Sequence, residues 1–196
     1  CRAEGVPVLR RLTGGTGVVH RGDLGVALAL PATHPWARGV AGLYGRFLDV
    51  LEPALRAAGA KLTRKQNPPH AARVRSPICF EDQLSDTLLV DGHKAVGCAQ
   101  TRRRGAVLIH AAVLLGLDPA LYAAVFGVDE ERVTLGLAPA IPGGDWRAVG
   151  QIVVSRLAEA LDLDPSWQPR SPLPEELLDR YTDPRWAPVP DGENES

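Results

Sequence analysis

The sequence predicts an α/β fold, in which strands and amphipathic helices share a chain of 196 residues. Three patterns indicate this class. Residues 24–30 alternate larger apolar side chains with small ones, as in a half-buried strand. Residues 86–90 and 93–101 flank Asp91-Gly92, a dipeptide typical of a two-residue hairpin turn. Apolar residues recur at helical spacing over residues 39–58.

The other elements follow from the same patterns. We expect strands over residues 6–11, 17–20 and 106–115, and helices over residues 119–126, 129–135, 146–161 and 174–181. Asp145 is placed to cap the helix that begins at Trp146. Residues 61–80 are polar, basic and rich in proline, which predicts a long irregular loop that carries Cys79.

The length fits a single domain with its own core. We expect this domain over residues 1–190, followed by a disordered acidic tail over residues 191–196. The chain begins at Cys1, and residues 5–9 resemble a loop that enters a strand. We therefore expect that an N-terminal part is missing or belongs to a separate subunit.

Composition narrows the class of protein. Apolar residues make up 45% and charged residues 23% of the chain, which is usual for a globular domain. No apolar run approaches the roughly 18 residues of a membrane span, and we expect neither a membrane nor a nucleic acid as partner. Three cysteines far apart argue against a disulfide framework and a zinc site, and favour a reduced, cytoplasmic setting.

Charge is divided unevenly along the chain. Residues 1–104 hold 16 Lys and Arg against 8 Asp and Glu, a net +8, and residues 105–196 carry a net −9. The basic half suggests a docking surface for an acidic partner. The alternative is that solvated arginines merely cover the surface.

Residues 14–17, Gly-Gly-Thr-Gly, form a glycine-rich run that lets backbone approach a ligand closely, although such a run is often only a turn. No Gly-Lys-Ser/Thr follows, so it is not a Walker loop. A strand and not a helix is expected after it, which excludes a dinucleotide fingerprint.

The glycine-rich run is part of one longer motif, and the Asp91-Gly92 hairpin turn is part of another. Residues Arg10, Arg11, Thr13, Gly14, Gly15, Val18 and His20 match Arg-Arg-x-Ser/Thr-Gly-Gly-x-x-Val-x-His, and Asp91, Gly92, Lys94, Gly97, Ala99 and Gln100 match Asp-Gly-x-Lys-x-x-Gly-x-Ala-Gln. In this order they resemble the lipoate/octanoate protein transferases of the biotin/lipoate ligase superfamily. The chain departs from that pattern at Thr16, where Gly or Arg is usual, and at Gly17, where Ala is usual. Arg21 and Ile109 replace an acidic residue and a glutamine.

The resemblance implies a biotin/lipoyl-ligase-like catalytic domain with a mixed β-sheet and flanking helices. It implies that Lys94 hydrogen-bonds the acyl carbonyl, where an ammonium stabilises developing charge. The residues expected to bind the acyl group are Arg11, Thr13, Gly14, Gly15, Val18, His20, Gly97, Ala99 and His110. His110 could equally be a core histidine, and His20 is a weak candidate for a general base.

Cys79 distinguishes between two branches of the family. Arg75-Ser76-Pro77-Ile78-Cys79-Phe80 is similar to the Arg-Ser-x-x-Cys-Phe segment of cysteine-dependent octanoyl transferases, whereas ATP-dependent ligases need no cysteine there. A free cysteine is commonly a small buried apolar residue, but this one lies in a basic loop, where cations favour a thiolate. Cys98 is expected to serve packing.

We therefore predict an acyltransferase that moves octanoyl from acyl carrier protein to a lysine of lipoyl-domain proteins through a Cys79 thioester. No cofactor or metal is expected. The alternatives are an amidotransferase between lipoyl domains, an ATP- and Mg-dependent lipoate ligase, and a non-catalytic acyl-binding subunit.

Overall fold

The computed structural model describes residues 1, 3–65, 76–83 and 86–164. It divides into two compact units, residues 1–12 with 166–196 and residues 13–165. In the first unit, the carbonyl of Cys1 accepts hydrogen bonds from the amides of Glu4 and Val6 at 3.1 and 3.0 Å. The strand predicted over residues 6–11 is wrong, because these residues form no strand pairing. An apolar pattern does not by itself supply the neighbouring strand that a ladder requires.

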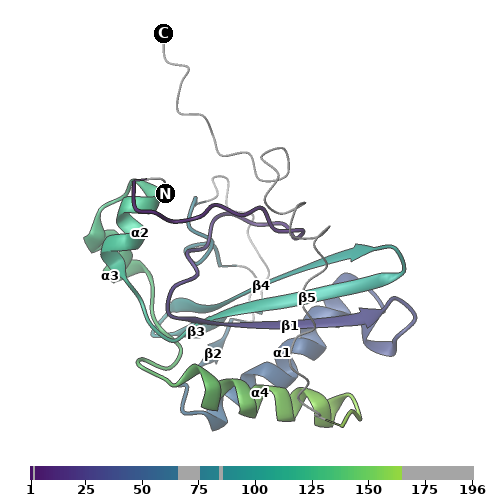
Figure 1. Ribbon diagram of the computed structural model, residues 1–196. Coiled ribbons are helices and arrows are strands. Elements are labelled where there is room, and N and C mark those ends of the chain that lie inside the picture. Colours follow the sequence, from purple (N-terminus) through teal and green to yellow (C-terminus); the bar gives the residue numbers. More distant parts are fainter. Residues whose placement is uncertain (2, 66–75, 84–85, 165–196) are drawn as a thin grey trace. The chain divides into compact units, whose positions relative to one another are not determined.

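The second unit is built on a sheet of five strands (Figure 1). All described strand pairs of this sheet are antiparallel, whereas the resemblance implied a mixed sheet. The strands are β1 (Asp23–Pro31), β2 (Thr63–Arg64), β3 (Leu88–Val90), β4 (His93–Arg103) and β5 (Ala106–Leu114), in the order β1-β5-β4-β3-β2. Short β2 lies inside the segment that we expected to be wholly irregular. One parallel bridge, between Gly17 and Ile78, lies outside the sheet.

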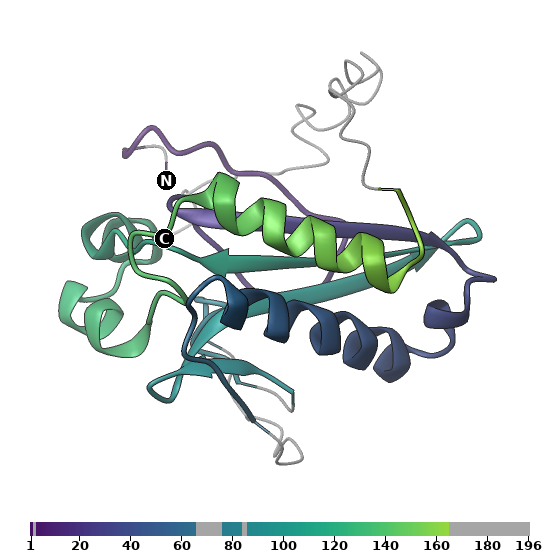
Figure 2. The ribbon, with the colours of Figure 1, turned by 90° about the horizontal axis from the view of Figure 1, so that it is seen from below.

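Two helices cover one face of the sheet. Helix α1 (Val40–Ala57) and helix α4 (Trp146–Ala160) lie side by side on this face and run roughly along the strands, as Figure 2 shows. Their apolar stripes pack on alternate residues of the strands, and the main core contains Leu43, Phe47, Leu51, Val149, Val153, Val26, Ile109 and Val113. The helical spacing therefore predicted the buried face of α1, except that Val40 at its start is exposed.

The helix ends show how polar residues shape this layer. The Asp145 side chain accepts from the Arg147 amide at 3.0 Å, which confirms the expected cap of α4. The short helix η1 (Pro35–Ala37) leads to Gly39, the N-cap of α1, which has no side-chain cap. Arg102 of β4 instead donates to the carbonyls of Ala37 and Gly39, both at 2.6 Å, and so fixes this connection to the sheet.

Helices α2 (Pro119–Phe126) and α3 (Glu130–Gly136) form a separate pair at one end of the sheet (Figure 1). Asp118 caps α2 by accepting from the Leu121 amide at 3.0 Å. A second, smaller core joins the pair to the sheet face opposite α1 and α4, through Tyr122, Val133, Ile78, Phe80, Ala112 and Leu114. This second core underlies the candidate site.

Both β-hairpins turn over two residues. Asp91 and Gly92 have φ of 49° and 85°, as the predicted turn requires, and Arg104 and Gly105 have 49° and 74°. None of the described helices combines the length and apolar character needed to cross a bilayer. The helix predicted over residues 174–181 and the tail over residues 191–196 lie outside the described residues.

Candidate active site

The glycine-rich segment and the cysteine segment meet through their backbones. The amide of Gly17 donates to the carbonyl of Pro77, and the amide of Cys79 donates to the carbonyl of Gly17, both at 2.9 Å. These two bonds form the parallel bridge between Gly17 and Ile78. Of the strand predicted over residues 17–20, this bridge is the part that forms. Two motifs that are distant in sequence thus become neighbours at the cysteine.

Gly17 is required by a close aromatic contact. A Cβ at this position would lie 2.5 Å from Cε1 and 2.9 Å from Cζ of Phe126, and 3.3 Å from the carbonyl oxygen of Pro77. Such distances are far inside van der Waals contact, so a larger residue would displace the Phe126 ring. The structure therefore gives a physical reason for glycine at a position where the motif usually carries alanine.

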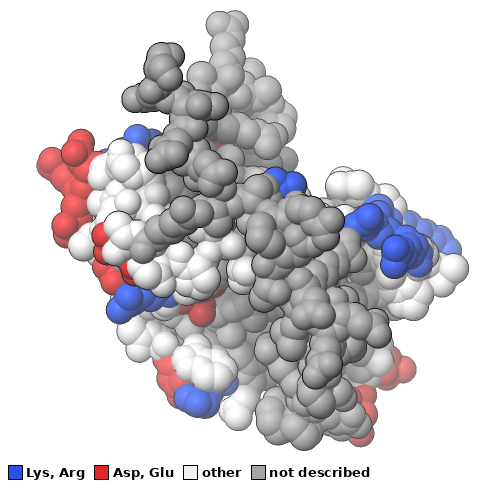
Figure 3. All heavy atoms as spheres, turned by 45° about the horizontal axis from the view of Figure 1, so that its top comes forward, with Lys and Arg blue, Asp and Glu red and all other residues white. Residues whose placement is uncertain are grey.

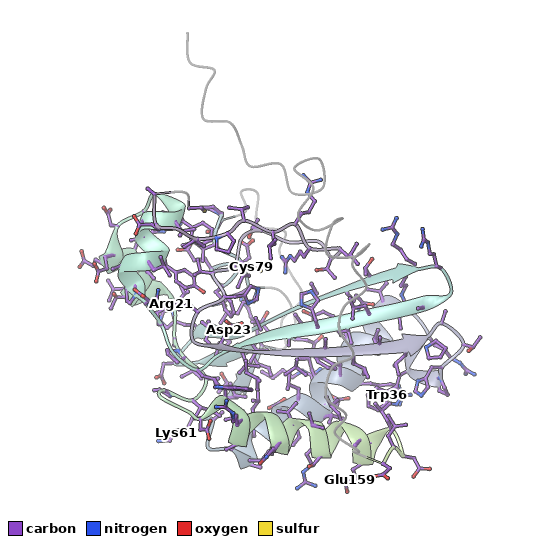
Figure 4. The ribbon with its side chains drawn as sticks, viewed as in Figure 1. Arg21, Asp23, Trp36, Lys61, Cys79 and Glu159 are labelled. Carbon is purple, nitrogen blue, oxygen red and sulfur yellow. The ribbon has the colours of Figure 1, made fainter. Side chains whose placement is uncertain are left out.

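Cys79 lies between two buried anchors. Ile78 and Phe80 are fully buried in the second core, while Cys79 between them is partly exposed. Figure 4 places Cys79 on the opposite side of the sheet from Glu159 of α4. Burial of its neighbours therefore fixes the backbone at Cys79.

A β-bulge turns Lys94 toward this cysteine. Leu89 pairs with Lys94 but Leu88 pairs with Val96, so Ala95 is an extra residue in β4. Val96 packs in the main core beneath the sheet, and regular alternation would point Lys94 to that same side. The extra residue reverses this, as a bulge commonly does. A Cβ on Gly97 would lie 3.7 Å from Cε of Lys94, so both residues are on the Cys79 side.

The Lys94 ammonium is held by the cysteine segment. Its Nζ donates to the backbone carbonyls of Cys79 and Asp82 at 2.8 and 2.9 Å, and lies 3.9 Å from Sγ of Cys79. It also lies 5.9 Å from the centre of the Phe80 ring. The residue is only 8% exposed. An ammonium has three donors, so two fix the backbone and one remains for the sulfur or for a group bound to it.

Several predicted acyl-binding residues continue this face along the sheet. Gly97 lies against Phe80, and Ala99 pairs directly with His110 of β5. Nε2 of His110 is hydrogen-bonded at 2.7 Å to Oγ1 of Thr13, at the start of the glycine-rich segment. The structure thus brings Thr13, Gly97, Ala99 and His110 onto the face that carries Cys79 and Lys94.

The other residues that were predicted to bind the acyl group have different surroundings. Val18 packs against the second core, and Gly14 and Gly15 are exposed. His20 is exposed and bonds through Nδ1 to the carboxylate of Asp23 at 2.8 Å. Arg11 belongs to the other unit, and its role in the site stays a prediction.

The other cysteines have different surroundings. Cys98 packs against the main core, on the side of the sheet away from Cys79, and its carbonyl accepts from the Tyr44 hydroxyl at 3.0 Å. Burial raises the pKa of the Cys98 thiol to about 12, so this thiol stays neutral. Cys1 is exposed. The expected packing role of Cys98 is confirmed. Within the described residues, no group of three His, Cys, Asp or Glu is placed to share a metal ion.

Some of the basic residues that the structure describes are bound within the fold, whereas Arg73 and Arg75 of the predicted docking surface lie outside the described residues. Figure 3 shows Lys and Arg gathered at the end of the sheet where the β4–β5 hairpin turns. Arg102 there is bound to backbone carbonyls, so it serves the fold. Arg64 is bound to Asp49 and Asp86 at 2.6 and 3.0 Å. Arg103 and Arg104 remain exposed at the turn.

Sequence reasoning missed the residues that support the cysteine segment. They are Glu81 and Asp82 within the segment, Arg132 of α3 and Phe126 of α2. No local motif marks them, because each acts through a partner that only the fold brings near.

The fold is that of lipoate-protein ligases. A lipoate-protein ligase A bound with ATP superposes with a TM-score of 0.72 at 20% identity, over 95% of this chain and 73% of that one. A bi-partite lipoate protein ligase from Thermoplasma acidophilum gives 0.69 at 20% identity, over 95% of this chain and 72% of that one.

Sequence comparison defines the family. Residues 1–139 match the model of the lipoyl protein ligase A/B catalytic domain, and the chain belongs to that family. It is 32% identical over 138 residues to octanoyltransferase LipM of Geobacillus kaustophilus, covering 67% of this chain and 50% of the relative. It is 33% identical over 136 residues to the LipM of Kyrpidia tusciae, with the same coverage. The chain thus spans about half the length of these curated relatives.

Proposed function

We propose that this protein is an acyltransferase of protein lipoylation that transfers octanoyl from acyl carrier protein to a lysine of lipoyl domains. The observation that carries the proposal is the pairing of Cys79 with Lys94, whose Nζ lies 3.9 Å from Sγ. A cysteine beside a buried ammonium is suited to hold an acyl group as a thioester. Family membership and the names of relatives about 30% identical support octanoyl transfer as the reaction.

The reaction has two exchanges at one sulfur. In the first, Sγ of Cys79 attacks the thioester carbonyl of the donor, and the carrier thiol leaves with the proton that Cys79 gives up. In the second, the lysine amine of the acceptor attacks the Cys79 thioester, an amide forms, and the Cys79 thiol is regenerated with a proton from the amine. Lys94 donates to the carbonyl oxygen as it gains charge in each attack.

The sheet face beside Cys79 suits a linear acyl chain. Gly97 and Ala99 present little side-chain volume along β4, and Thr13 is bonded to His110 on the neighbouring strand. An apolar chain that lies along these residues would leave the thioester carbonyl at the Lys94 end. Thr13, Gly14, Gly15, Val18, His20 and Arg11 are proposed to complete the acyl site.

The donor already carries an activated acyl group, so the proposal requires neither ATP nor a metal. The donor and the acceptor protein approach the Cys79 sulfur one after the other. We propose that the reaction takes place in the cytoplasm. A ligase would instead consume ATP to activate a free carboxylic acid.

A transfer assay without ATP tests the proposal. The protein is mixed with octanoyl-acyl carrier protein and a lipoyl domain, and the mass of the lipoyl domain is followed. We expect octanoylation that Cys79→Ala abolishes. Transfer that requires ATP and releases AMP would replace the proposal with a ligase, and transfer only from an octanoylated lipoyl domain would replace it with an amidotransferase. Acyl binding without transfer from any donor would indicate a non-catalytic subunit.

A further inference from the structure

Helix α3 contacts the chain beside both residues of the proposed pair. Arg132 binds the Glu81 carboxylate with two hydrogen bonds, Nε to Oε1 at 2.9 Å and Nη2 to Oε2 at 2.6 Å. At the end of the helix, the carbonyl of Gly136 accepts from Nδ1 of His93 at 3.1 Å. Glu81 follows Cys79 by two residues, and His93 directly precedes Lys94.

The Glu81 carboxylate also organises the cysteine segment from within. It accepts the hydroxyl of Ser76, whose oxygen in turn accepts the Ile78 amide at 3.0 Å. The Ser76 amide donates to the Asp82 carboxylate at 3.1 Å, and the Glu81 amide donates to the Ile78 carbonyl at 3.1 Å. The carboxylate that Arg132 holds is therefore part of the closed turn that carries Cys79.

The ion pair between Arg132 and Glu81 is partly buried, and its carboxylate is charged. The Glu81 side chain is 15% exposed and the Arg132 side chain 50%. Hydrogen bonds from Arg132 hold the pKa of Glu81 below its ordinary value, so the carboxylate is ionised at neutral pH. A two-bond contact between a planar guanidinium and a carboxylate fixes direction as well as distance.

We propose that α3 is a positioning clamp for the proposed acyl-transfer reaction. Arg132 acts through Glu81 on the cysteine turn, and Gly136 acts through His93 on the lysine hairpin, so one short helix sets the spacing of Cys79 and Lys94. Arg132 and Glu81 are positioning residues that do not touch the acyl group. The predicted effect of α3 on the acylation rate rests on the proposed function. Its predicted effect on the cysteine turn rests on the hydrogen bonds alone.

Two measurements on the same variants test the clamp. The first is the rate of Cys79 octanoylation by octanoyl-N-acetylcysteamine at saturating donor, followed by intact mass. The second is amide hydrogen exchange of residues 76–82. The variants are Arg132→Ala and Arg132→Lys, with Arg156→Ala as the control. The Arg156 side chain is about as exposed as that of Arg132, 55% against 50%, and it pairs with the more exposed Glu159 on α4, on the far face of the sheet.

We expect Arg132→Ala to lower the saturated acylation rate between about tenfold and a hundredfold, because small misplacements of a reacting group cost rates of that order. The donor concentration for half-saturation should change little. Arg132→Lys should recover part of the rate, since it keeps the charge and a single bond. The amides of Ser76, Ile78 and Glu81 should exchange faster in Arg132→Ala only, and Arg156→Ala should match the wild type in both measurements.

An Arg132→Ala variant that keeps either the wild-type rate or the wild-type protection of residues 76–82 would overturn the clamp. Failure of the proposed function would look different: the wild type itself would form no adduct at Cys79. Amide exchange would still decide in that case whether Arg132 holds the turn, because it depends on no acyl donor.

Discussion

Nζ of Lys94 lies 2.8 Å from the backbone oxygen of Cys79 and 3.9 Å from its sulfur, so one side chain both fixes the cysteine backbone and faces its thiol. The bulge at Ala95 makes this contact possible, since it brings Lys94 to the Cys79 side of the sheet. The second carbonyl, from Asp82, leaves the ammonium a single donor for chemistry.

Lys94→Ala should lower the rate of octanoyl transfer by about 10²–10³, which is typical for loss of one donor to a developing oxyanion. Lys94→Arg should not restore the rate, because a planar guanidinium cannot reproduce three contacts of a buried ammonium. The exposed Lys61→Ala serves as the control for lost charge. A Lys94→Ala enzyme within about threefold of the wild type would contradict this role.

Gly17→Ala should destabilise the protein by about 1–3 kcal/mol, the usual cost of overpacking, because the added Cβ meets the Phe126 ring at 2.5 Å. Phe126→Leu in the same chain should relieve the clash and recover part of the loss. Urea unfolding of the single and double variants measures the coupling. Additive effects of the two substitutions would show that the ring does not restrict position 17.

Acid should weaken the contact between Glu81 and Arg132. Hydrogen bonds from Arg132 lower the pKa of Glu81 in the folded protein, and the unfolded chain has the ordinary value of about 4.3. The stabilisation is therefore present above about pH 4.3 and is lost as the pH falls through the lower folded pKa. Glu81→Gln should melt below the wild type at pH 7, with a smaller difference at pH 3. A difference independent of pH would contradict this interpretation, and Glu159→Gln, in the more exposed pair with Arg156, is the control.

Arg103 and Arg104 are predicted to attract the acidic donor. Their reversal to glutamate should slow transfer from octanoyl-acyl carrier protein and spare octanoyl-N-acetylcysteamine. The wild-type rate with the carrier should also fall with salt, because the Debye length shrinks from roughly 10 Å at 0.1 M to 3 Å at 1 M. Arg102 is left intact in this test, because it binds the carbonyls of Ala37 and Gly39. Equal losses with both donors would assign the two arginines to the fold or the acyl site.

Local patterns predicted the parts of the structure that depend on local forces. The turn at Asp91-Gly92, the buried stripe of α1 and the cap at Asp145 are each determined by a few neighbouring residues. The resemblance supplied Cys79 and Lys94 as a pair, and the structure places them in contact.

Long-range relationships were beyond the sequence patterns. The bridge from Gly17 to Ile78 needs a partner from another segment, and the bond from Arg132 to Glu81 joins residues 51 apart. The bulge at Ala95 depends on how β3 pairs with β4 and has no signature in β4 alone. The predicted strand over residues 6–11 failed for the converse reason, since its pattern is present but its pairing is not.

The central claim is that Cys79 carries the acyl group, and intact mass after mixing with octanoyl-acyl carrier protein tests it most directly. We predict that the wild type gains the mass of one octanoyl group and loses it in hydroxylamine. Cys79→Ser should gain no such mass. Cys98→Ala should still gain it, because the thiol of Cys98 is neutral and lies on the other side of the sheet. A wild-type protein that transfers octanoyl without this adduct, or a Cys79→Ser protein that still forms it, would contradict the account.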